Sequence, residues 1–208
     1  MASLQLMTFC TAFDGSLLPF TPMGRNEDSL YATLRRMIEP GTVIAHLPWT
    51  VWHEPSPARQ FASDAVSRGL SRLSVNDALL LLLLHRPPRS LKAAAAWLED
   101  LRSWAPREFL RLLTELRVGS LCVQLDTISR TLRAYGSSPG WWVQELRAGQ
   151  LILEQMLESD RLLEGCERLQ EYAGSFGTLL RAWPAIREVA AAQTMPSPYG
   201  QEIYAARS

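Results

Sequence analysis

The sequence lacks the features that would mark several common classes of protein. Its three cysteines, Cys10, Cys122 and Cys166, are far apart and form no Cys-x-x-Cys pair, so neither a disulfide framework nor a zinc site is indicated. Lysine plus arginine number 21, and aspartate plus glutamate also number 21. No excess positive charge is therefore available for nucleic acid or an anionic membrane. We expect no nucleic-acid partner, and cysteines that remain buried thiols in a reducing compartment.

Long apolar segments are also missing. The most hydrophobic run, ALLLLLLH at residues 78–85, is far shorter than the roughly 18 apolar residues that span a bilayer. The stretch MASLQLMTFCTAF at residues 1–13 carries no lysine or arginine before its apolar run, so it does not fit a secretory signal. We expect no transmembrane segment and a cytoplasmic location.

The first 57 residues alternate strand-like and helix-like patterns. LQLMTFC at residues 4–10 fits a buried strand, and a loop rich in glycine and proline follows it. Apolar residues then recur at helical spacing over residues 30–38, and TVIAHLPWTVWH at residues 42–53 is rich in β-branched and aromatic residues. This order predicts an incomplete α/β segment, strand–loop–helix–strand, over residues 1–57. Such a segment must pack on the rest of the chain or leave a sheet edge open to a partner.

Residues 58–193 have an almost wholly helical pattern, so the predicted fold class is mainly α, with the short α/β segment followed by an α-helical bundle domain. Ser74 and Asn76 are candidate caps of a leucine-rich helix whose apolar surface runs nearly all the way round, which favours a central position in the bundle. Residues 194–208 are expected to form a loose tail. The predicted helices are 58–70, 74–86, 89–103, 106–117, 119–135, 139–158, 159–173 and 175–193, with breaks that include residues 136–140 and 174–177.

Two side-chain patterns in the helical region have more than one interpretation. The tryptophan pair Trp141 and Trp142 would pack in the core, or else offer an aromatic surface to a sugar ring. Arginines and glutamates alternate at helical spacing, which indicates a solvated face with ion pairs. These charged residues are Arg102, Arg107, Arg111, Arg117, Glu99, Glu108 and Glu115.

The first candidate catalytic residues are the acidic pair Glu27 and Asp28, which follow Asn26 directly ahead of the predicted helix. Asparagine is a favoured N-cap, and acidic side chains in a first helical turn are stabilised by the helix dipole by about 0.3–1 kcal/mol each. A carboxylate at a helix start, after a glycine- and proline-rich loop and beside a strand, is also well placed to act as a general base. Both interpretations stay open on the residues alone.

Histidine supplies a second candidate group. His53 ends the predicted strand of residues 42–53, where an imidazole would reach the sheet edge and bind a metal or carry a proton. The alternative is a partly exposed loop histidine. His46 lies seven residues earlier, on the opposite face of the same strand, and His85 ends the leucine-rich helix, where it would interact with the helix dipole.

The order RNED, apolar helix, EPG turn and TVIAHLPWTVWHEP resembles the second half of the catalytic domain in family 2 glycosyltransferases, which are inverting enzymes of the A-type fold. In that family a Glu-Asp pair precedes a short helix and a proline-containing strand that runs on to a histidine. Glu27 and His53 are 26 positions apart here, and Pro48 lies near the place of the strand proline. The resemblance implies Asp28 as catalytic base with Glu27 as its neighbour. It also implies His53 near a divalent metal, Mn or Mg, or near the diphosphate.

The resemblance covers roughly residues 1–55 and implies a sugar nucleotide and a glycan acceptor as ligands. Leu30 stands where the family often has a further aspartate, and no Asp-X-Asp metal motif occurs in the sequence. A divalent metal is therefore expected only if a complete site forms. One hypothesis is the acceptor-side part of a glycosyltransferase, truncated and inactive alone, with a protein partner that supplies the nucleotide-binding half. The alternative is a non-enzymatic α-helical interaction or scaffold protein.

Overall fold

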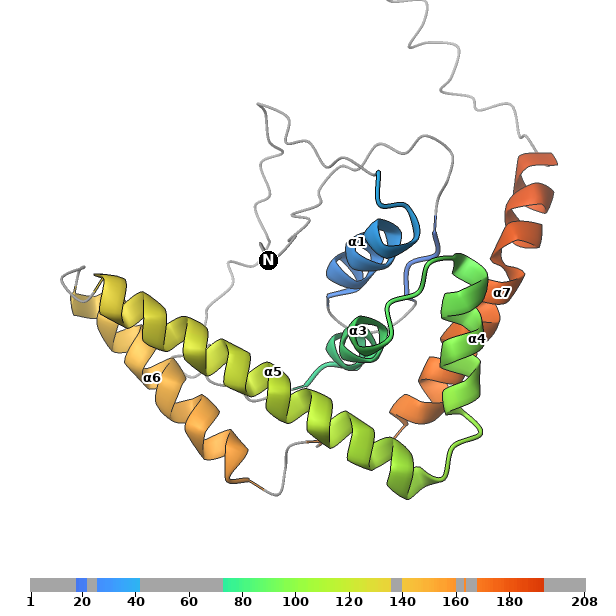
Figure 1. Ribbon diagram of the computed structural model, residues 1–208. Helices are drawn as coiled ribbons and strands as arrows, with labels where there is room; N and C mark the ends of the chain where they lie inside the picture. The colour runs from blue at the N-terminus through green and yellow to red at the C-terminus, as the bar shows by residue number, and fades with distance from the viewer. Residues whose placement is uncertain are drawn as a thin grey trace, which may run out of the picture.

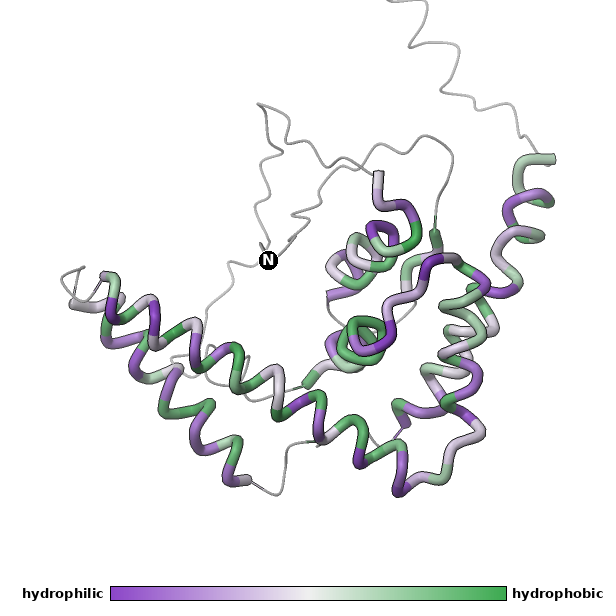
Figure 2. Tube along the Cα trace, viewed as in Figure 1, coloured by the Kyte–Doolittle hydropathy of each residue, from purple (hydrophilic) through white to green (hydrophobic). Residues whose placement is uncertain are grey.

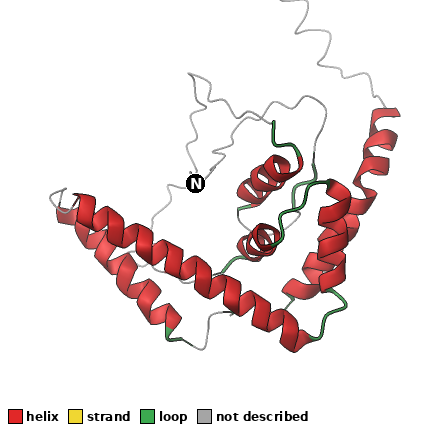
Figure 3. Ribbon diagram, in the orientation of Figure 1, coloured by secondary structure: helices red, strands yellow, loops and turns green. Residues whose placement is uncertain are grey.

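The computed structural model describes residues 18–21, 26–41, 73–135, 140–159, 163 and 168–192. These residues form helices and contain no strand, which confirms the mainly α fold class (Figure 3). The predicted strands, the predicted helix 58–70, the boundary at residue 57 and the tail lie outside the described residues. The helices are α1 (Glu27–Ile38), α3 (Val75–His85), α4 (Leu91–Leu101), α5 (Pro106–Tyr135), α6 (Gly140–Leu157) and α7 (Leu169–Ala192).

Helix α3 lies at the centre of the arrangement and contacts α1, α5 and α7 (Figure 1). Helices α4 and α7 pack side by side, and α6 packs along the far part of the long helix α5. Helix α1, the helix of the predicted α/β segment, therefore packs on the helical domain. None of the described helices is both long and apolar enough to cross a membrane.

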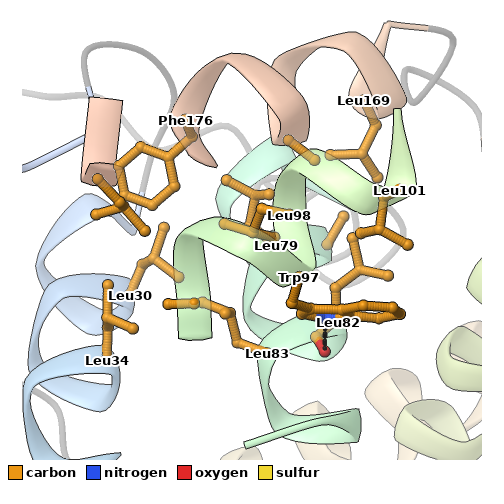
Figure 4. Packing of buried hydrophobic residues seen from close by; sticks show 14 of the residues in the cluster. Leu30, Leu34, Leu79, Leu82, Leu83, Trp97, Leu98, Leu101, Leu169 and Phe176 are labelled. Atoms are coloured by element: carbon orange, nitrogen blue, oxygen red, sulfur yellow. Dashed lines mark hydrogen bonds between the residues drawn. The ribbon is translucent and has the colours of Figure 1, made fainter. Parts of the chain in front are cut away.

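The leucine-rich helix α3 is the centre of the core, as its sequence predicts. Leu79, Leu82 and Leu83 are fully buried, and apolar side chains from α1, α4, α5 and α7 surround them (Figure 4). The indole Nε1 of Trp97 donates a hydrogen bond to the Leu82 carbonyl oxygen at 3.2 Å. A buried indole N–H requires such a partner, since an unpaired buried donor costs about 1–3 kcal/mol.

Of the two predicted caps of α3, Ser74 is confirmed and Asn76 is wrong. The Ser74 hydroxyl accepts a hydrogen bond from the Asp77 backbone N–H at 3.1 Å, and the Asp77 carboxylate accepts one in return from the Ser74 backbone N–H. This reciprocal arrangement is a capping box, which satisfies two N–H groups that helix geometry leaves without partners. Asn76 lies within the first turn of α3 and is buried.

The predicted break at residues 174–177 is wrong, because α7 runs through it without interruption. The glycines there allow α7 to approach α4 closely. A Cβ atom at Gly177 would lie 2.9 Å from both the Ala95 carbonyl oxygen and the Glu99 backbone nitrogen. One turn later an Arg181–Glu99 ion pair joins the two helices, and the hydrogen bond from Arg181 lowers the pKa of Glu99.

Helix α5 likewise replaces the two predicted helices 106–117 and 119–135 with one helix of 30 residues. Gly119 lies inside it and is exposed, and a Cβ atom added there would meet nothing within 4 Å, so this glycine causes no break. At 1.5 Å per residue the helix is about 45 Å long. Its first half packs on the core through Phe109 and Leu113. Its second half forms a small separate cluster with α6, namely Leu121, Leu153 and Met156.

The prediction of a solvated charged face holds for part of α5 only. Arg111 and Glu115 form an exposed ion pair at 4.0 Å. Arg117, by contrast, is only 5% exposed, and its guanidinium Nη2 reaches the Met156 Sδ at 4.0 Å. The assignment of Arg117 to the solvated face was wrong, because the buried residues of α5 follow one another at intervals of four and form a single stripe that contains it. Arg117 lies in this stripe between Leu113, which packs in the main core, and Leu121, which packs on α6.

We expect opposite effects from alanine at two helical glycines. Gly177→Ala should lower the free energy of unfolding by about 1–3 kcal/mol, because the new methyl group would meet the α4 backbone. Gly119→Ala should raise the free energy of unfolding by up to about 1 kcal/mol, since the position is open and alanine favours helix. Urea denaturation of both variants measures the difference. A gain of stability in both would show that α4 and α7 are not in close contact.

Candidate functional site

The candidate site begins at Asn26, the residue at the N-cap position of α1. Its backbone has φ 65°, in the left-handed region, and its side chain makes no capping hydrogen bond. Instead, its Nδ2 donates to the Asp77 Oδ1 at 2.8 Å. The position of the predicted cap is therefore correct, but the side chain binds α3 instead of its own helix. This bond fixes the start of α1 against the start of α3.

Glu27 and Asp28 occupy the first turn of α1, as predicted. Glu27 is exposed and Asp28 is partly buried. The Asp28 Oδ1 accepts a hydrogen bond from the Ser29 backbone N–H at 2.8 Å. Among the described residues, neither carboxylate joins an ion pair. The positive end of the helix dipole stabilises negative charge at this position.

An aromatic pair that the sequence patterns did not indicate lies on the same helix. The Phe20 ring stacks on the Tyr31 ring, with centroids 4.3 Å apart and planes 9° apart. Tyr31 follows Asp28 by three residues, so the two lie on one side of α1. The Arg35 Nη1 donates to the Tyr31 hydroxyl at 3.4 Å. The available signal was the presence of one aromatic residue just before the RNED turn and another one helical turn after it.

The structure does not test the convergence of the acidic pair with the histidine. Glu27 and Asp28 are together, whereas His53 lies outside the described residues. Among the residues that are described, no group of three or more histidine, cysteine, aspartate or glutamate side chains could hold a metal ion. The predicted metal ligand His53 is not one of these described residues.

The tryptophan pair at the start of α6 does not pack in the core as we expected. Trp141 is 68% exposed, and Trp142 makes an edge-to-face contact with Tyr135 at 6.3 Å between centroids. The core prediction was wrong for Trp141. Among the described helices, α6 packs substantially against α5 only, so a residue on another side of α6 is not covered by the bundle. Figure 2 shows this pair of helices extending from the body of the molecule.

Known proteins offer no relative from which a function could be transferred. The chain matches no protein-family model, no curated protein and no solved structure. The function must therefore be inferred from the residues themselves.

We predict that the left-handed backbone of Asn26 can be measured through two substitutions. Asn26→Ala should lower the free energy of unfolding by about 2 kcal/mol, because it loses the bond to Asp77 and because alanine tolerates the left-handed conformation less well than asparagine. Asn26→Gly loses the same bond without the conformational cost, so it should be about 1 kcal/mol more stable than the alanine variant. Urea denaturation gives both values. Equal stability of the two variants would contradict the left-handed conformation.

Proposed function

We propose that this chain is a glycosyltransferase-like protein that carries the acceptor side of a sugar-nucleotide-dependent transfer reaction, with Asp28 as catalytic base. The main support is the pattern of hydrogen bonds that the side chains at the start of α1 make. Asn26 fixes the turn through Asp77, and the Asp28 Oδ1 accepts a hydrogen bond from the adjacent Ser29 backbone N–H. A carboxylate held in place in the first turn of a packed helix is well placed to act as a general base.

The proposed chemistry is a single displacement with inversion. The oxygen of an acceptor hydroxyl attacks the anomeric carbon of the donor sugar, and the bond from that carbon to the nucleoside diphosphate breaks. The hydroxyl proton passes to the Asp28 carboxylate. Glu27 is exposed beside it in the first turn of α1.

The donor side is proposed to come from a protein partner. Residues 1–208 contain no Asp-X-Asp motif, and family 2 glycosyltransferases use such a motif to bind the metal and diphosphate. His53 would lie near that metal once both parts are assembled. On this proposal the purified chain binds a glycan acceptor but transfers no sugar without its partner.

We expect Asp28→Ala to weaken acceptor binding. A carboxylate that accepts a hydrogen bond from the reacting hydroxyl contributes about 1.5–3 kcal/mol, because charged acceptors bind more strongly than neutral ones. The affinity of the purified chain for an immobilised oligosaccharide that it retains should therefore fall by about ten- to a hundredfold. An oligosaccharide array followed by surface plasmon resonance measures this.

Glu145→Ala is the matched control, because Glu145 is an exposed acidic residue on α6, away from the site. It should bind like the wild-type chain, and thermal unfolding should show that both variants are folded. Equal affinity of Asp28→Ala and wild type would argue against Asp28 as the acceptor-side base. Failure of the wild-type chain to retain any oligosaccharide would argue against the acceptor site itself.

A second candidate function, an α-helical interaction protein, is favoured by the pair α5–α6. This pair carries large apolar side chains that are exposed: Val123 at 65%, Tyr135 at 58%, Trp141 at 68% and Leu151 at 59%. Exposed apolar side chains on a projecting element are typical of a protein-binding surface. This function is compatible with a transferase partner that docks on the same helices.

We predict that a photo-crosslinking amino acid at position 141 captures a partner protein in cells, whereas the same amino acid at position 107 does not. Arg107 is exposed at the start of α5, at the opposite end of that helix from the α6 junction. The crosslinked products are separated by size and identified by mass spectrometry. Equal capture at the two positions would show that α6 is not a specific surface.

A further inference from the structure

The short segment of residues 18–21 presents one aromatic side chain to solvent and buries its neighbours. Leu18, Pro19 and Thr21 are all buried, whereas Phe20 is 43% exposed. Burial of the residues on both sides fixes the segment against α1, so the exposure of Phe20 does not come from a loosely placed loop. The molecule therefore holds a large apolar ring outward at a defined position.

The Phe20 ring is held in place by contacts on the side that faces the protein. One of its faces stacks on Tyr31, which is only 3% exposed and belongs to the main core cluster. Tyr31 is itself held by Arg35, whose Nη2 pairs with the Glu39 Oε2 at 3.0 Å. The ring is thus oriented before any ligand arrives, which reduces the entropy lost on binding.

We infer that Phe20 is the platform on which the acceptor sugar stacks, beside Tyr31 and so about one helical turn from Asp28. This inference rests on the proposed function, because the acceptor is a sugar only if the chain serves glycosyl transfer. Aromatic faces carry partial negative charge and attract the weakly positive C–H groups on the apolar face of a pyranose. A sugar stacked on Phe20 would lie on the side of α1 that carries Tyr31 and Asp28.

The charges around the platform define the class of acceptor. Glu27, Asp28 and Asp77 lie at the starts of α1 and α3. The basic residues Arg35 and Arg36 lie in the last turn of α1, and Arg35, which contacts Tyr31, is paired with Glu39. Like charges near one another are unfavourable, so this surface disfavours a uronic or sialic acid. The inferred acceptor end is a neutral pyranose.

The test uses the purified full chain on an array of immobilised oligosaccharides that end in neutral pyranoses, with matched ones that end in uronic acids. The wild-type chain should retain neutral ends in preference to acidic ones. Phe20→Leu keeps an apolar side chain and removes the ring, so the affinity should fall by about tenfold. Phe20→Tyr keeps the ring and should bind within about twofold of wild type. Glu145→Ala, which changes an exposed residue on α6 away from the platform, is the control and should not alter binding.

Comparison of Phe20→Leu with Asp28→Ala tests the platform and the catalytic proposal separately. Wild-type affinity in Phe20→Leu, with Asp28→Ala weakened on the same array, overturns the platform and leaves the proposed function intact. Weak binding by Phe20→Leu with unchanged binding by Asp28→Ala supports the platform and argues against Asp28 as the acceptor-side base. Preference for uronic acid ends, or retention of no oligosaccharide, overturns the platform. Thermal unfolding of Phe20→Tyr and Phe20→Leu confirms that the variants are folded.

Discussion

The carboxylate of Asp77 is the interaction on which the candidate site depends. Its Oδ2 accepts a hydrogen bond from the Ser74 hydroxyl at 2.6 Å and takes part in the capping box that starts α3. Its Oδ1 accepts a hydrogen bond from the Asn26 amide at 2.8 Å and so fixes the start of α1. One side chain therefore starts the central helix and places the acidic pair relative to it. The bond to Asn26 also offsets the cost of a left-handed asparagine.

The core explains why that position is rigid. Leu30 and Leu34 of α1 are buried among the leucines of α3, and α3 in turn packs against α5 and α7. Functional groups held on packed helices keep their geometry better than groups on loops. In this chain the acidic pair lies in the first turn of α1, directly before the buried residues that start at Leu30. The core therefore holds the helix that carries the pair.

The sequence predicted elements that local patterns determine, and it failed where packing decides. The leucine pattern and Ser74 sufficed for α3 and its start. Gly119 and Gly177 look alike as possible breaks, yet one is exposed in a continuous helix and the other allows a close helix contact. The exposure of Trp141 and the burial of Arg117 depend on which side α5 turns to its neighbours, and no local pattern contains that information.

The candidate site shows the same division. The acidic pair was found because its residue types and its place before a helix are local signals. The bond between Asn26 and Asp77 joins residues 51 positions apart, and the stack of Phe20 on Tyr31 brings a loop residue onto a helix. Contacts of this kind exist only after the chain has folded. His53 stays a prediction, since it lies outside the described residues.

The continuity of α5 has a mechanical consequence. Its first half is fixed in the core through Phe109 and Leu113, while its second half is joined to α6 alone by a small cluster. A stiff rod anchored at one end acts as a lever, so a slight tilt near Arg117 becomes a large displacement at the Tyr135 end. The position of the Tyr135 end is therefore determined by how the first half of α5 packs against α3.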